Sequence, residues 1–313
     1  MKSNTTLFTF SLRTLILFIF SIALVACEDI ISPALENADP VLAVDAWINN
    51  KNETQVIRLA LTQPYFQNTV PDGVSGAAVT ITDNEGKNYF FVENNNKAGD
   101  YLWTPPTSSE VFGKTGNAYQ LNIQLKTGEV FAATSYMGSV PVIDSVTLTF
   151  EPETAIQPDS YIAEFWATEV PGSGDTYWIK AFKNGVLLNK PEEINIAFDA
   201  GFSAGGNFDG VTFITPKRRG VNPNDVDVNK KSISPYQPGD SLNVEIHSLT
   251  VEAFNYMNEV IIQTNRPGGF SELFASPIAN VSTNIFNVNK SGPSAVGFFT
   301  VSAISTRGKR FKK

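Results

Sequence analysis

Cysteine and histidine each occur only once in this sequence of 313 residues, as Cys27 and His247. A single thiol cannot form a disulfide within the chain, so burial alone must stabilise the folded part. A single histidine excludes a metal site built on a histidine pair and disfavours Ser-His-Asp and Cys-His catalysis. We therefore expect no catalytic residue, no metal and no cofactor, and we expect His247 on the solvent side of a strand.

Positive charge and long apolar runs are also scarce. The sequence has 23 Lys and Arg against 31 Asp and Glu, which gives a net charge of −8. An acidic body is a poor partner for nucleic acid, so we expect none. No stretch after Cys27 has the roughly 18 or more consecutive apolar residues of a membrane-spanning helix.

The N-terminus has the order of a bacterial export signal. Lys2 and Arg13 are followed by an apolar run over residues 15–26 that is too short to span a bilayer of about 30 Å. The run ends in a segment that resembles a lipobox, formed by Leu24, Val25, Ala26 and Cys27. We predict a signal peptide over 1–26, a lipid on the Cys27 thiol and a tether over 27–40, which together anchor the protein to a membrane. An ordinary secreted protein with an incidental cysteine is the alternative.

Residues 41–139 show the period-two pattern of half-buried strands. Ile57, Leu59 and Leu61 alternate with other side chains, and glycine-containing turns such as residues 84–86 separate such runs. This region predicts an N-terminal antiparallel sandwich of immunoglobulin-like or transthyretin-like size.

A second β-rich domain is predicted over residues 140–313, after the break at Pro141. The pair Asn184 and Gly185 is a strong hairpin signal. One amphipathic helix is expected at about 249–262, because apolar side chains recur there on a single helical face. These are Leu249, Ala253, Phe254, Met257, Val260 and Ile261.

Two loops of the second domain are candidate binding sites. Residues 201–210 are glycine-rich but lack the Gly-Lys-Ser/Thr ending of a phosphate loop, so Phe202 and Phe208 are either exposed contact residues or core plugs. Residues 225–229 begin like a calcium loop, but Lys230 replaces the glycine of the sharp turn and Tyr236 replaces the bidentate acid. We therefore predict a polar loop without calcium.

Several segments in order resemble one family over nearly the whole exported chain. Residues 74–83, 139–145, 267–270, 277–285 and 296–303 are similar to the Bacteroidota lipoproteins of domain of unknown function 4249, DUF4249. The resemblance implies an outer-membrane lipoprotein that is typically encoded beside a TonB-dependent receptor and is supposed to assist uptake at the surface, and it supplies no catalytic residue. Glu28 and Asp29 are similar to acidic signals for display at the cell surface.

Three functions remain open after these observations. The leading hypothesis is a non-catalytic binding or accessory component of uptake through a TonB-dependent receptor. The alternative is a surface structural or adhesion lipoprotein, which the neighbouring genes would separate from the first. A hydrolase of extracellular polymers is the third, and the single histidine weighs against it.

Overall fold

The computed structural model describes residues 38–64, 67–154, 158–266 and 268–312. The predicted signal peptide, Leu24, Val25, Ala26 and Cys27 lie outside these residues, as does most of the predicted tether. Within the described ranges no helix is both long and apolar enough to cross a membrane.

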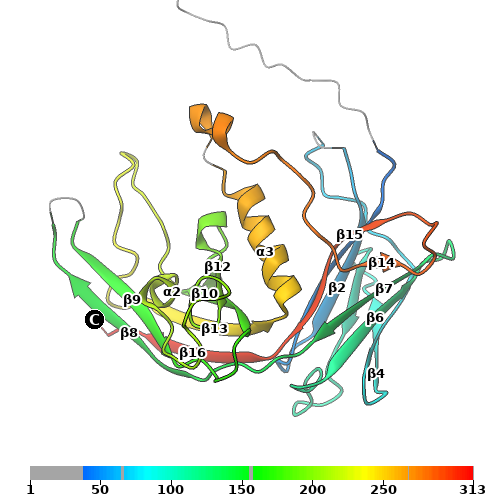
Figure 1. Cartoon of the computed structure of the whole chain (residues 1–313), viewed down its shortest axis with the longest axis horizontal. Coiled ribbons are helices and arrows are strands. Elements are labelled where there is room, and N and C mark those ends of the chain that lie inside the picture. The colour runs from blue at the N-terminus through cyan, green and yellow to red at the C-terminus, as the bar shows by residue number, and fades with distance from the viewer. Residues whose placement is uncertain (1–37, 65–66, 155–157, 267, 313) are drawn as a thin grey trace, which may run out of the picture. The chain divides into compact units, whose positions relative to one another are not determined.

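Nine strands form the largest sheet (Figure 1). Their order is β14-β7-β6-β3-β4-β5-β2-β1-β15. Alternate side chains such as Ile57, Ile81 and Leu121 point into a shared core, as the period-two pattern predicts. The strands are β1 (Leu42–Asn49), β2 (Gln55–Leu61), β3 (Ala78–Asp83), β4 (Asn88–Glu93), β5 (Asp100–Trp103), β6 (Ala118–Gln124), β7 (Val130–Tyr136), β14 (Phe286–Asn287) and β15 (Ala295–Ser302).

The prediction of an antiparallel sandwich is corrected by the two C-terminal strands of this sheet. β15 pairs in parallel with β1, with Leu42 opposite Ala295, while β14 pairs with β7. The backbone N–H of Val301 in β15 also donates to Ser135 Oγ in β7 at 3.1 Å, so the sheet is mixed and nearly closed. Residues 41–139 therefore do not complete their own sheet, because strands from beyond residue 280 fill the gap.

The rest of the described chain is also β-rich, as expected for residues 140–313. β8 (Ile143–Glu151) pairs with β9 (Ser160–Ala167), and a second antiparallel sheet has the order β11-β10-β13-β16, with β12 also pairing β10. Asn184 and Gly185 both have positive φ, 51° and 83°, in the predicted hairpin between β10 and β11. The remaining strands are β10 (Thr176–Lys183), β11 (Val186–Leu187), β12 (Asn195–Phe198), β13 (Ser241–Leu249) and β16 (Ile304–Arg310).

The predicted amphipathic helix is α3 (Val251–Thr264). It begins two residues later than expected, because Leu249 ends β13 and Thr250 caps the helix by accepting a hydrogen bond from the Ala253 N–H at 3.2 Å. Its buried face contributes Phe254 and Met257 to a core that also contains Phe298 of β15. Shorter helices are η1 (Pro191–Glu193), α2 (Thr215–Arg219) and η2 (Gly269–Phe274).

Candidate functional site

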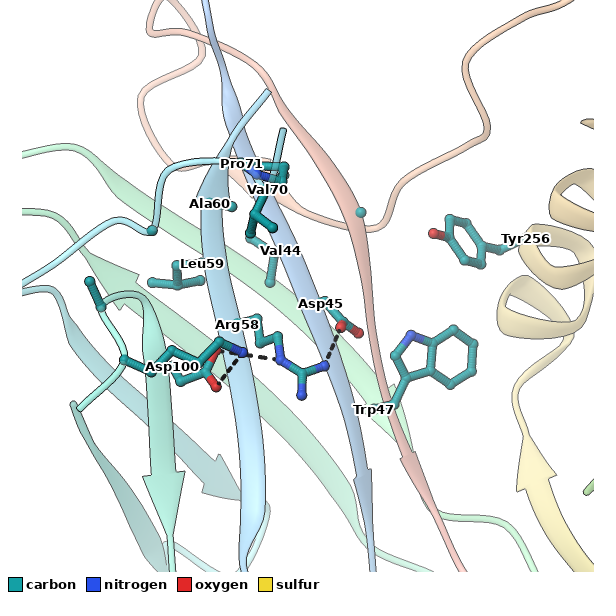
Figure 2. Close-up of a pocket in the computed structure, with 15 residues that line it drawn as sticks. Val44, Asp45, Trp47, Arg58, Leu59, Ala60, Val70, Pro71, Asp100 and Tyr256 are labelled. Carbon is teal, nitrogen blue, oxygen red and sulfur yellow. Dashed lines mark hydrogen bonds and ion pairs between the residues drawn. The ribbon is translucent and has the colours of Figure 1, made fainter. Parts of the chain in front are cut away.

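A cavity of about 480 Å³ lies on the outer face of the nine-stranded sheet, and α3 contributes Tyr256 to one side of it (Figure 2). Val44 and Ala46 of β1 point into the core, so the alternating Asp45 and Trp47 point away from it. The segment after β2 closes one side with Val70 and Pro71. The size lies within the roughly 300–1,000 Å³ of small-ligand sites.

A row of charged side chains crosses three neighbouring strands at this cavity. Asp45 of β1 is opposite Arg58 of β2, which is opposite Asp100 of β5. Arg58 Nη1 lies 3.3 Å from Asp45 Oδ2, and Arg58 Nε lies 3.4 Å from Asp100 Oδ1. Lys97 Nζ is 3.0 Å from the other oxygen of Asp100. The register of the sheet thus produces an alternation of acceptors and donors.

Small residues form the floor beside the charged row. Ala43 faces Ala60 across β1 and β2, and Gly73 bridges to Ala60. Gly297 of β15 has a φ of 95°, and a Cβ placed there would lie only 2.0 Å from the Val44 carbonyl oxygen. Glycine is required at this position, both for the left-handed conformation and for the close approach of β15 to β1.

Aromatic side chains form the wall toward α3. The ring of Trp47 lies 6.1 Å from that of Tyr256 on α3, and Tyr256 lies 4.7 Å from the ring of Phe298. Burial raises the pKa of Tyr256, and the nearby carboxylates of Asp45 and Glu259 add to this effect, so the phenol is neutral at physiological pH. In Figure 2, Trp47 and Tyr256 lie on one side of the cavity and Asp100 lies on the other.

Trp47 also contacts a buried polar cluster behind the cavity. Its ring lies 5.4 Å from that of Trp178, which is 6.1 Å from the His247 ring. His247 Nε2 lies 3.1 Å from Glu245 Oε2, and Lys51 forms an ion pair with Glu245. The expectation that His247 faces solvent is therefore wrong, because the face of β13 that it occupies is covered.

The pKa values of His247 and Glu245 are both lowered, which makes the two groups weak bases. Burial lowers the pKa of His247 to about 4, although Glu245 opposes the shift. Burial tends to raise the pKa of Glu245, but hydrogen bonds from His247 and Lys51 outweigh it and lower that pKa to about 2. A buried neutral imidazole beside an ion-paired carboxylate stabilises the structure and has no solvent-exposed face for proton transfer.

The two phenylalanines of the glycine-rich loop have different environments. Phe202 is 55% exposed, and its ring lies 4.2 Å from Lys217 Nζ. Phe208 packs against the core of the second sheet, and its ring occupies the space beside Gly201. The loop is held down where the Gly210 N–H donates to Glu169 Oε2 at 2.6 Å. Phe202 therefore remains available as a contact residue, whereas Phe208 is mainly a core plug.

The loop that begins like a calcium site is organised by its own backbone. Asp227 Oδ1 accepts hydrogen bonds from the N–H groups of Asn229 and Lys231 at 2.8 and 2.9 Å, and Lys190 pairs with Asp225. Over the described ranges, no three histidine, cysteine or acidic side chains are arranged to hold a metal ion.

The charged groups that the cavity offers to a ligand are Asp45, Arg58, Lys97 and Asp100. Its lining contains no serine, threonine, cysteine or histidine, and both of its carboxylates contact the same guanidinium of Arg58. Sequence reasoning missed this site, because Arg58 appeared only as the polar member of an alternating strand and Tyr256 lies about two hundred residues away.

Comparison with known families gives a match over most of the chain. The family described as "Domain of unknown function (DUF4249)" matches residues 28–308. No curated protein matches the chain.

Proposed function

This chain belongs to the DUF4249 family, and on that premise we propose that it is an outer-membrane lipoprotein that binds a ligand without transforming it and assists uptake through a TonB-dependent receptor. The proposal has three parts, namely the binding site, the membrane anchor and the receptor contact. Each part rests on different residues and can fail separately.

The cavity at Asp45, Arg58 and Tyr256 is the observation that carries the proposal. It combines an apolar floor and an aromatic wall with a few fixed polar groups, which is the usual composition of a small-ligand site. Its two carboxylates, Asp45 and Asp100, are both ion-paired with Arg58 and so are not free to act as an acid and a nucleophile, which supports binding more than catalysis. A polymer hydrolase is for the same reason the weakest of the three candidate functions.

The anchor is the lipid expected on Cys27, followed by a polar tether. Confining the protein to the membrane of its receptor raises their effective concentration, so a modest interface suffices for association. The acidic pair Glu28 and Asp29 favours display at the cell surface.

The receptor contact is best supported by an exposed apolar segment around η2. Phe270, Leu273 and Phe274 are 77%, 75% and 79% exposed, and the rings of Phe270 and Phe274 lie 5.6 Å apart. Ile278 adds a fourth exposed apolar side chain. Clusters of this kind mark interaction surfaces. Phe202 in the glycine-rich loop offers a second, smaller contact.

Adhesion is the alternative function, and the same apolar segment favours it, because a surface that binds another cell or matrix protein needs no transporter. The two functions differ in their membrane partner. A structural or adhesive lipoprotein would not accompany a receptor through purification.

Mild-detergent purification from the native membrane, followed by mass spectrometry, tests the proposal. We expect the wild-type protein to begin at a lipidated Cys27 and to bring a TonB-dependent receptor with it. Cys27→Ser is the control, and it should give an unprocessed or soluble protein without the receptor. Recovery of the wild-type protein alone, from an extract that contains the receptor, would favour the adhesion function.

A further inference from the structure

The charges at the cavity cancel, and this limits the ligand that it can hold. Two carboxylates, Asp45 and Asp100, are matched by two cations, since Arg58 pairs with both carboxylates and Lys97 pairs with Asp100. An anionic ligand would approach two carboxylates, and a cationic ligand would approach a guanidinium and an ammonium. The balance favours a ligand without net charge.

The charged row also requires a polar ligand. A purely apolar ligand would remove water from Arg58 and Asp100 without replacing its hydrogen bonds, which costs free energy. The row presents acceptor, donor and acceptor in sequence across β1, β2 and β5. A hydroxyl group both donates and accepts, so neighbouring hydroxyls complement such a row in a way that a carbonyl or an amine alone cannot.

The opposite side of the cavity requires an apolar face on the same ligand. Trp47 and Tyr256 provide an aromatic wall, and Ala43, Ala60 and Gly297 contribute only small side chains or none to the lining. Aromatic rings favour contact with C–H groups, while the Tyr256 hydroxyl and the Trp47 N–H supply polar ends. The ligand must therefore carry hydroxyls on one side and C–H groups on another.

We propose that this cavity binds a neutral sugar ring, as a free saccharide or as the end of a glycan, with its hydroxyls on Asp45, Arg58 and Asp100 and its C–H face on Trp47 and Tyr256. The proposal rests on the proposed function, since it names the ligand of the same site. It selects neutral hexoses over their phosphorylated, amino and carboxylated derivatives.

A glycan array probed with the detergent-solubilised mature protein tests this assignment. The array should carry neutral mono- and oligosaccharides together with phosphorylated, sialylated and amino sugars. We expect retention on neutral glycans and a change in tryptophan fluorescence when the retained sugar is titrated in solution. Retention confined to charged sugars, or no retention of any neutral glycan, overturns the proposal.

Variants with matched controls assign the binding to this cavity. Arg58→Met should weaken binding roughly 10–100-fold, because hydrogen bonds to charged groups carry much of the affinity for a polar ligand. Arg219→Met is the control, since Arg219 also bridges two carboxylates, Glu151 and Glu164, on another part of the surface. Tyr256→Phe keeps the ring and should weaken binding less than Arg58→Met. Equal effects of Arg58→Met and Arg219→Met would overturn the assignment.

The receptor co-purification separates this inference from the proposed function. If the receptor co-purifies and no neutral glycan binds, the sugar assignment fails and the uptake role stands. If neutral glycans bind in an Arg58-dependent manner and the receptor never co-purifies, the sugar assignment stands and the uptake role fails.

Discussion

Asp45 and Arg58 face each other across β1 and β2, and Arg58 Nη1 lies 3.3 Å from Asp45 Oδ2 on the outer surface of the sheet. Both side chains are more than half exposed, so the pair adds little to stability, about 1 kcal/mol or less. The pair lies beside the aromatic wall of the cavity, where it can form hydrogen bonds with a ligand. A charged pair that contributes little to folding is available to contribute to recognition.

We expect the fold to lose stability in acid because His247 is buried. Because burial lowers its pKa from the ordinary value of about 6.5 to about 4, the unfolded chain binds a proton more readily than the folded one. The stability contributed by the neutral imidazole is complete above pH 6.5 and is lost progressively between pH 6.5 and 4, by about 3 kcal/mol. Glu245, with a pKa of about 2, adds a further loss below its ordinary value of about 4.3.

Chemical denaturation at a series of pH values measures this loss. His247→Gln should reduce the dependence of the free energy of unfolding on pH between 6.5 and 4, while wild type retains it. The charged neighbours Glu245, Lys51 and Lys180 are present in both proteins. Identical pH profiles for the two would show that His247 is not the source.

We expect replacement of Lys180 by an uncharged residue to stabilise the protein. Burial lowers the pKa of this lysine to about 8, although its ammonium contacts the Trp178 ring at 3.8 Å. The free energy of unfolding that neutral Lys180 allows is complete above the ordinary lysine pKa of about 10.4. It is lost as the pH falls toward 8, because the unfolded chain takes up the proton first. Lys180→Met should therefore be more stable than wild type at pH 7, with the difference shrinking toward pH 10.

Lys87→Met provides the comparison for Lys180→Met, since Lys87 lies at the surface and pairs with Glu110. We expect no gain in melting temperature for this variant at either pH. A Lys180→Met protein that is less stable than wild type at pH 7 would mean that the Trp178 contact outweighs the cost of burying the charge.

We expect a side chain at Gly297 to destabilise the parallel pairing of β1 with β15. Gly297→Ala must adopt a left-handed backbone and also place its Cβ against the Val44 carbonyl, which together cost roughly 2–5 kcal/mol. Gly86 has a similar φ of 86° with open space around it, so Gly86→Ala should lose only about 1–2 kcal/mol. Urea titration of both variants separates strain from clash. Equal losses would contradict the close approach of β15 to β1.

We expect polar substitutions in the apolar segment at η2 to weaken association with the receptor without lowering the stability of the fold. Phe270 and Phe274 are largely exposed, so Phe270→Ser with Phe274→Ser should change the free energy of unfolding by no more than about 0.5 kcal/mol. The receptor recovered in co-purification should fall strongly. Val228→Ser, at a residue that is 99% exposed, is the control and should leave recovery unchanged. Full recovery with the double variant would exclude this segment as the contact.

Local sequence patterns predicted the elements of this fold better than their partners. The alternation at Ile57 and Leu59 identified a strand, and Asn184 with Gly185 identified a hairpin, since both signals arise within a few residues. The pairing of β1 with β15 depends on residues from opposite ends of the described chain, and no local pattern specifies it. The prediction of a purely antiparallel sandwich was wrong for that reason.

The candidate site was hidden from sequence reasoning for the same physical cause. Asp45, Arg58 and Asp100 become a row only through strand register, and Tyr256 lines the same cavity only because α3 packs beside the edge strand β15. Burial of His247 likewise depends on what covers β13. For Phe202 and Phe208 the sequence leaves exposure and burial equally open, and the structure separates the exposed ring of Phe202 from the packed ring of Phe208.

The claim that the protein binds without transforming its ligand is tested most directly by recovering the ligand after binding. The neutral glycans retained on the array should be incubated overnight with a stoichiometric amount of purified wild-type protein and then analysed by mass spectrometry. The account predicts that each glycan is recovered with its mass unchanged, because both carboxylates of the cavity, Asp45 and Asp100, are held by Arg58. Shorter glycans that form with wild type and do not form with Arg58→Met would contradict it and identify the cavity as the active site of a hydrolase.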